Sequence, residues 1–98
     1  MTEAEYQAQL IKKIGELFPG SVVLKNDSGY QQGMPDLTIL YLDMWAMLEV
    51  KASPKAGLQP NQQFLVEQLD AMSFAAFIYP DNERDVLNAL QQAFASHG

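Results

Sequence analysis

Two apolar segments lie almost end to end in the middle of this chain, and they constrain its fold more than any other feature. Residues 36–42 (DLTILYL) and 45–51 (WAMLEVK) each have the length of a strand, and only a short region around Asp43 separates them. A short connection between two such segments favours an antiparallel hairpin. The hairpin predicts that the start of the first strand lies beside the end of the second.

Helical and strand patterns flank this hairpin on both sides. Before it we expect a helix over about 2–17, which Thr2 and Glu5 begin with a capping box. Its apolar residues recur at helical spacing: Tyr6, Leu10, Ile14 and Leu17. Pro19-Gly20 ends this helix, and a short strand follows over 21–24, running to about 26.

The second half of the chain alternates between helix and strand. After a loop over 52–59 we expect a helix over 61–72, a strand over 74–79 and a last helix to about 95, which Pro80-Asp81-Asn82 caps. Helical spacing of apolar residues marks the two helices: Phe64, Leu65, Leu69 and Met72, then Val86, Leu87, Leu90 and Phe94. The order αβββαβα predicts an α/β fold with a small mixed sheet covered by helices.

Length and composition restrict the class of protein. The 98 residues fit one domain, 1–98, and the lack of cysteine excludes disulfides and zinc–thiolate sites. The longest apolar stretch is too short to span a membrane and no signal-peptide pattern begins the chain, so we expect a soluble cytoplasmic protein. The net charge of −6 counts against a broad electrostatic grip on nucleic acid, although bound divalent ions would neutralise clustered carboxylates.

The residues that suggest chemistry lie at the open end of the hairpin. Glu49 and Lys51 are two apart in a strand and therefore share one face of the sheet, whereas Val50 points to the other face. Asp36 begins the preceding strand and lies almost opposite Glu49 or Lys51, depending on the register. Two carboxylates and one amine would thus converge.

This grouping suits metal-assisted hydrolysis of a phosphodiester. Two carboxylates bind Mg²⁺, which polarises the phosphate and lowers the pKa of a bound water. Lys51 would orient that water or stabilise the transition state, and the Val50 carbonyl is a possible further ligand. The alternative is a solvated ion pair of ordinary strand-end residues, and the motif by itself leaves the two interpretations about equal.

Several short motifs, in this order, resemble a known family. Gly33-X-Pro35-Asp36 followed by Glu49-Val50-Lys51 resembles the PD-(D/E)XK nuclease superfamily, and most closely its virus-type replication-repair nuclease (VRR-NUC) domain. Asn26-X-Ser28-Gly29 precedes the first motif as in that family. Residues 58–62 (LQPNQ) resemble its Leu-Ser-Pro-X-Gln helix start, with Gln59 in place of the usual serine. The resemblance covers nearly the whole chain, and the expected αβββαβα order matches the restriction-endonuclease-like fold.

The resemblance implies roles for particular residues. Asp36 and Glu49 would bind Mg²⁺ or Mn²⁺, Lys51 would be the catalytic lysine, and Gln62 would face the site. The family also places a catalytic, metal-binding glutamate on the first helix, and Glu3 fits this role better than Glu5, because the capping box already explains Glu5.

The resemblance further implies an activity and partners. It predicts an endonuclease for branched or flapped DNA, of the Holliday-junction type, in a bacterium or a phage-infected cell. It also implies a homodimer, and a helicase or other replication or repair protein is a possible partner. Two alternatives remain, both motivated by the acidic charge: a catalytically silent DNA-binding protein with the nuclease fold, and a nuclease subunit that depends on a partner.

Weaker candidates surround the main motifs. Lys25 and Lys55 are possible phosphate contacts, although a lone lysine is more often simply solvated. Residues 28–31 form either a DNA-contacting loop or a plain surface loop. His97 lies near the chain end, where we do not expect catalysis.

Overall fold

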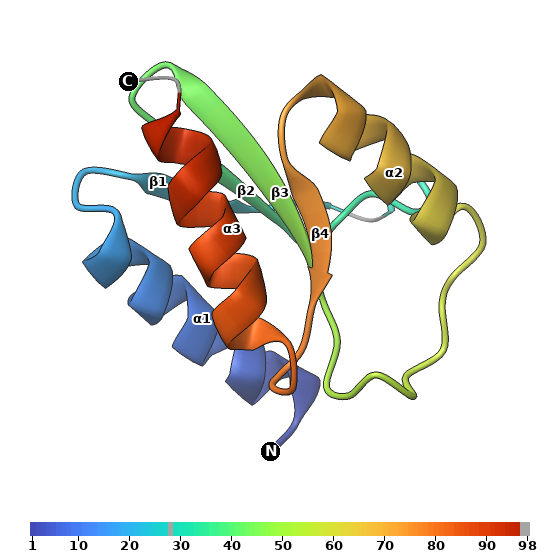
Figure 1. Ribbon diagram of the computed structural model, residues 1–98. Helices are drawn as coiled ribbons and strands as arrows, with labels where there is room; N and C mark the ends of the chain where they lie inside the picture. The colour runs from blue at the N-terminus through green and yellow to red at the C-terminus, as the bar shows by residue number, and fades with distance from the viewer. Residues whose placement is uncertain (28, 97–98) are drawn as a thin grey trace.

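The computed structural model describes residues 1–27 and 29–96 of the chain, and its elements follow the predicted order (Figure 1). The elements are α1 (Glu3–Leu17), β1 (Val22–Lys25), β2 (Leu37–Tyr41), β3 (Met44–Val50), α2 (Gln62–Met72), β4 (Ala75–Ile78) and α3 (Glu83–Ala95). The predicted boundaries agree with these to about one residue. The α/β class is therefore confirmed.

The four strands form one mixed sheet in the order β1-β2-β3-β4. β1, β2 and β3 pair antiparallel, as the hairpin pattern predicts, and β4 pairs parallel to β3 after the α2 crossover. The turn between β2 and β3 consists of Leu42 and Asp43, because Tyr41 pairs directly with Met44. β1 and β4 are the two edge strands of the sheet.

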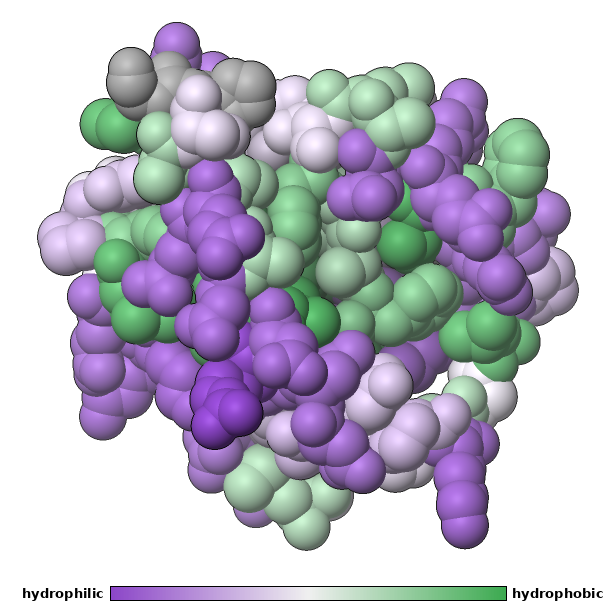
Figure 2. Space-filling view, in the orientation of Figure 1, coloured by the Kyte–Doolittle hydropathy of each residue, from purple (hydrophilic) through white to green (hydrophobic). Residues whose placement is uncertain are grey.

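Helices cover both faces of the sheet. α1 and α3 lie side by side on one face, and α2 lies on the other (Figure 1). The larger core fills the first interface with residues such as Leu10, Leu48 and Leu90, all essentially inaccessible to solvent. A smaller cluster around Val66, Leu69 and Ala75 joins α2 to the sheet. Figure 2 shows hydrophilic side chains over the outer faces of α1 and α3, and apolar surface between α3 and α2.

α1 begins as predicted, but the last apolar residue of its buried face is not the predicted one. Thr2 Oγ1 accepts from the Glu5 N–H and Glu5 Oε1 accepts from the Thr2 N–H, which completes the capping box. Leu17 is exposed, and the next residue, Phe18, is buried in its place. Phe18 lies four residues after Ile14, and its ring packs against Tyr41 and Phe94.

Of the four apolar residues that identify α2 in the sequence, the helix fully buries only Leu69. Phe64 and Met72 are exposed, whereas Gln62, Val66 and Leu69 face the sheet. The helix is therefore rotated so that a glutamine, rather than a phenylalanine, points inward at its first turn. This rotation brings Gln62 toward the end of β3.

The last helix follows the prediction in position but not in the capping contact. Asn82 occupies the N-cap position of α3 without capping it. Its side chain instead accepts from the Tyr79 N–H and donates to the Phe77 carbonyl, closing the turn after β4. Within the described residues, no helix is long and apolar enough to cross a membrane.

Candidate active site

The register of the β2–β3 hairpin decides which residue faces Asp36. Leu37 pairs with Leu48, so one step further along the ladder Asp36 stands opposite Glu49. Asp36 Oδ2 also accepts a hydrogen bond of 2.9 Å from the Val50 N–H. Of the two registers that the sequence left open, the structure has the one that brings the two carboxylates together.

Asn26 holds the strand segment that carries Asp36. The Asn26 N–H donates to the Asp36 carbonyl at 2.8 Å, and Asn26 Nδ2 donates to the Pro35 carbonyl at 2.9 Å. Asn26 Oδ1 accepts from the Thr38 hydroxyl at 3.0 Å. All of these groups belong to β2 or its start, so Asn26 positions Asp36 without lying in the site itself. The sequence presents Asn26 only as part of a loop motif, and nothing in it signals this positioning role.

Glu49, Lys51 and Gln62 form a buried polar network. Lys51 Nζ lies 3.3 Å from Glu49 Oε2 and donates to Gln62 Oε1 at 3.0 Å. Gln62 Nε2 donates to the same Glu49 Oε2 at 2.9 Å. All three residues are under 9% exposed, which is unusual for charged side chains. The interpretation of Glu49 and Lys51 as a solvated ion pair is therefore wrong.

The loop after β3 completes this network. Lys51 Nζ donates to the Gly57 carbonyl at 3.2 Å, and the Gln59 N–H donates to Gln62 Oε1 at 2.8 Å. Gln62 thus links α2, the loop and β3 through one amide. The sequence places Gln62 near the site, but it gives no sign that Gly57 and Gln59 support it.

One carboxylate oxygen of Glu49 has no hydrogen-bond partner within residues 1–27 and 29–96. Among the described residues nothing donates a hydrogen bond to the buried Glu49 Oε1, whereas Oε2 accepts one from Gln62 and is ion-paired with Lys51. Burial raises the pKa of the Glu49 carboxyl to about 7, the charge of Asp36 raises it as well, and Lys51 partly offsets both. A buried oxygen that is costly to ionise and unsatisfied in hydrogen bonding favours a cation beside it.

Glu3, rather than Glu5, reaches this region. Asp36, Glu49, Lys51 and Gln62 line a polar depression of about 400 Å³, and Glu3 forms part of its wall. The other lining residues are Gln32, Gly33, Met34 and Gln59. Glu5 stays in the capping box, where its hydrogen bonds to Thr2 lower its pKa.

The donor set fits a divalent cation through two carboxylates. The described residues contain no group of three or more acidic, histidine or cysteine side chains close enough to hold a metal, so Glu3 does not join Asp36 and Glu49 as a third ligand. Mg²⁺ is commonly held by one or two carboxylates, with waters and substrate phosphate completing the shell. Asp36 and Glu49 Oε1 suit that arrangement, and a role for the Val50 carbonyl stays a prediction.

Gly33 brings the loop before β2 against the start of α2. Its φ of +86° lies in the region that favours glycine. A Cβ there would meet the Asn61 backbone at 3.1 Å and the Gln62 nitrogen at 3.3 Å. The Gly-X-Pro-Asp motif therefore has a structural reason, because only glycine lets Gln62 approach so closely.

Replacing Gly33 with alanine tests this contact. We expect a loss of about 1–3 kcal/mol in the free energy of unfolding, measured in urea. Alanine is strained at a φ of +86°, and its Cβ would push the start of α2 away. Gly20→Ala is the matched control, since Gly20 has a φ of +90° but nothing within 4 Å of its Cβ position. Equal losses in the two variants would show that the close approach at Gly33 has no energetic weight.

The remaining candidates lie at the surface. Lys25 and Lys55 are exposed, and Lys51 is the only cation among the residues described around the polar depression. Lys13 is engaged with Glu83 of α3. Tyr30 and Gln31 are exposed on the loop before β2, whereas Ser28 and His97 lie outside the described residues. Broad electrostatic binding of DNA therefore has little support at the site.

Comparisons with protein-family models, curated proteins and solved structures find no match for this chain. The resemblance to VRR-NUC nucleases thus rests on the sequence motifs alone.

Proposed function

We propose that this protein is a metal-dependent endodeoxyribonuclease with the PD-(D/E)XK fold, similar to VRR-NUC domains. The observation that carries the proposal is the unsatisfied buried oxygen of Glu49, beside Asp36 and within one network with Lys51. An ordinary structural ion pair would satisfy both oxygens of a buried carboxylate. The αβββαβα order and the mixed sheet support the same assignment.

Each residue has a distinct task in this proposal. Asp36 and Glu49 would hold Mg²⁺ or Mn²⁺, which supplies Lewis-acid polarisation of the phosphodiester and a more acidic bound water. Lys51 brings a positive charge, fixed by Gln62 and the Gly57 carbonyl, to the place where negative charge develops on phosphate. Gln62 holds the Lys51 and Glu49 side chains in place by hydrogen bonds to both. Glu3 lines the depression and would add a further negative charge to its wall.

Cleavage of a labelled substrate set tests this function. The set contains a four-way junction, a flap, a single strand and a duplex, each with Mg²⁺, Mn²⁺ or EDTA. We expect cutting that requires the metal and is greatest on branched or flapped DNA. Folded protein that cuts none of them with either metal would contradict the proposal in its stand-alone form.

The acidic charge favours a second candidate, a subunit of the same fold that relies on a partner. With a net charge of −6, the chain has few cations for phosphate contacts. A helicase-like replication or repair protein would then supply DNA recognition, and a catalytically silent DNA-binding subunit is the extreme case. Activity that appears only with a co-purified partner would support this candidate over the stand-alone enzyme.

A homodimer belongs to the same proposal, because paired cuts at a Holliday junction need two sites. The bacterial or phage-infected cytoplasm is the corresponding compartment. Light scattering on the DNA complex would show the dimer, and a monomer under the same conditions would exclude the junction-resolving version.

A further inference from the structure

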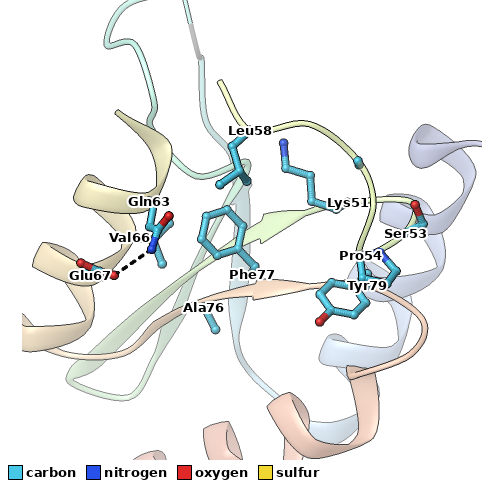
Figure 3. A pocket seen from close by; sticks show the side chains of 11 residues that line it. Lys51, Ser53, Pro54, Leu58, Gln63, Val66, Glu67, Ala76, Phe77 and Tyr79 are labelled. Carbon is cyan, nitrogen blue, oxygen red and sulfur yellow. Dashed lines mark hydrogen bonds between the residues drawn. The ribbon is translucent and has the colours of Figure 1, made fainter. Parts of the chain in front are cut away.

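An apolar cavity adjoins the candidate active site. It has a volume of about 390 Å³, and Lys51 forms part of both its wall and that of the polar depression. Its other walls come from the loop after β3, the first turns of α2, and β4 (Figure 3). Its lining includes Leu58, Gln63, Glu67, Phe77 and Tyr79. Its volume lies within the range of about 300–1,000 Å³ that is typical of ligand pockets.

Two aromatic side chains, those of Phe77 and Tyr79, form flat apolar walls of this cavity. Phe77 pairs with Glu49 across the β3–β4 ladder, so its side chain leaves the same face of the sheet as the carboxylate. Tyr79 follows two residues later on that face, and both rings are only half-buried. In Figure 3 the Phe77 ring lies beneath Leu58, and the Tyr79 ring lies near the loop. Flat apolar walls of this kind accept an unsaturated ring.

The apolar cavity and the polar depression differ in the charged groups that line them. The polar depression has Asp36 and the free Glu49 oxygen, which suit a cation and the phosphate it binds. The apolar cavity has Glu67 at its wall, hydrogen-bonded to Gln63. A carboxylate there disfavours a phosphate, but it can accept an N–H from the edge of a base.

We propose that the apolar cavity is a subsite for one nucleobase of the DNA strand that is cut. The proposal rests on the proposed nuclease function and extends it. A base attached next to the reacting phosphate would pass Lys51 and stack on Phe77 or Tyr79. Such a base must leave the duplex stack, so the cavity selects substrates with an unpaired base beside the cut. This is a physical basis for preferring flaps, junctions or single strands over intact duplex.

The first test needs neither metal nor catalysis. Deoxyadenosine and thymidine, which carry no phosphate, are titrated in EDTA into ¹⁵N-labelled protein while NMR shifts are followed. We expect shifts at Gln63, Phe77 and Tyr79 at millimolar nucleoside. Gln63→Trp should abolish them by filling the cavity, whereas Gln68→Trp, also exposed on α2, should not. The absence of shifts at these residues in the wild-type protein would overturn the proposal.

The second test uses substrates in which one abasic residue is moved along the strand. At one position beside the cut we expect kcat/KM to fall about 5- to 150-fold, the loss expected for one base stack. Gln63→Trp should remove this dependence, and Gln68→Trp should keep it. Cleavage that is equal at every abasic position would refute the subsite while leaving the nuclease intact. Nucleoside binding by a protein that cuts nothing would keep the subsite and refute the stand-alone hydrolytic function.

Discussion

Replacing Lys51 with alanine is expected to lower the single-turnover rate of DNA cleavage on the order of a thousandfold. Its ammonium is buried 3.3 Å from Glu49 and is oriented by Gln62, so water cannot take its place without rearrangement. Lys12→Ala is the control, because Lys12 is exposed on α1 and does not line the polar depression. Rapid-quench kinetics at saturating metal would measure both rates.

A loss of activity must be separated from a loss of fold. Lys51→Met keeps the apolar stem of the side chain but removes the ammonium and its hydrogen bonds to Gln62 and the Gly57 carbonyl. Circular dichroism should still show the native fold, whereas urea unfolding should show a loss of stability, because Glu49 stays buried without its counter-charge. A folded Lys51→Met protein that cuts DNA at the wild-type rate would show that Lys51 has a structural role alone.

Replacing Glu49 with glutamine is expected to remove a pH-dependent loss of stability. In the folded protein the pKa of Glu49 is raised from 4.5 to about 7, so the native state keeps a proton that the unfolded chain releases. Stability from this group is complete below about pH 4.5 and is lost as the pH rises through about 7. The shift corresponds to about 3 kcal/mol at alkaline pH.

Urea unfolding in EDTA between pH 4.5 and 8.5 measures this effect. The wild-type protein should lose stability relative to Glu49→Gln across that range, and Glu49→Gln should be the more stable protein at pH 8.5 but inactive. Parallel pH profiles for the two proteins would contradict the raised pKa. A carboxylate that weakens the fold at the proposed metal site would fit the usual opposition between stability and activity.

The sequence predicts the order of the helices and strands because the spacing of apolar residues is recognisable in each of them. It does not determine the register of the β2–β3 hairpin. Asp36 faces Glu49 because the β2–β3 turn has only two residues, with Leu42 at a φ of +57°. Leucine rarely adopts that conformation, so no local signal marks the turn. The convergence of the two carboxylates could therefore be expected, but the atom-level pairing could not.

The sequence also does not show which face of α2 points toward the sheet. Spacing identifies the helix through Phe64 and Leu69, but the contact with Gly33 and the loop after β3 set its rotation. Those are contacts between segments far apart in the sequence, and periodicity carries no information about them. Gln62 was predicted near the site by resemblance, whereas its bonds to both Glu49 and Lys51 follow only from the packed structure.

The most direct measurement is the binding of Mn²⁺ at pH 8 by isothermal titration calorimetry, with the wild-type protein beside Asp36→Asn and Asp43→Asn. Asparagine at position 36 can still accept from the Val50 N–H, and Asp43 lies at the opposite end of the same hairpin. Saturable binding that is lost in Asp36→Asn and kept in Asp43→Asn is the predicted result. Equal binding by all three proteins would contradict a metal centre at Asp36 and Glu49.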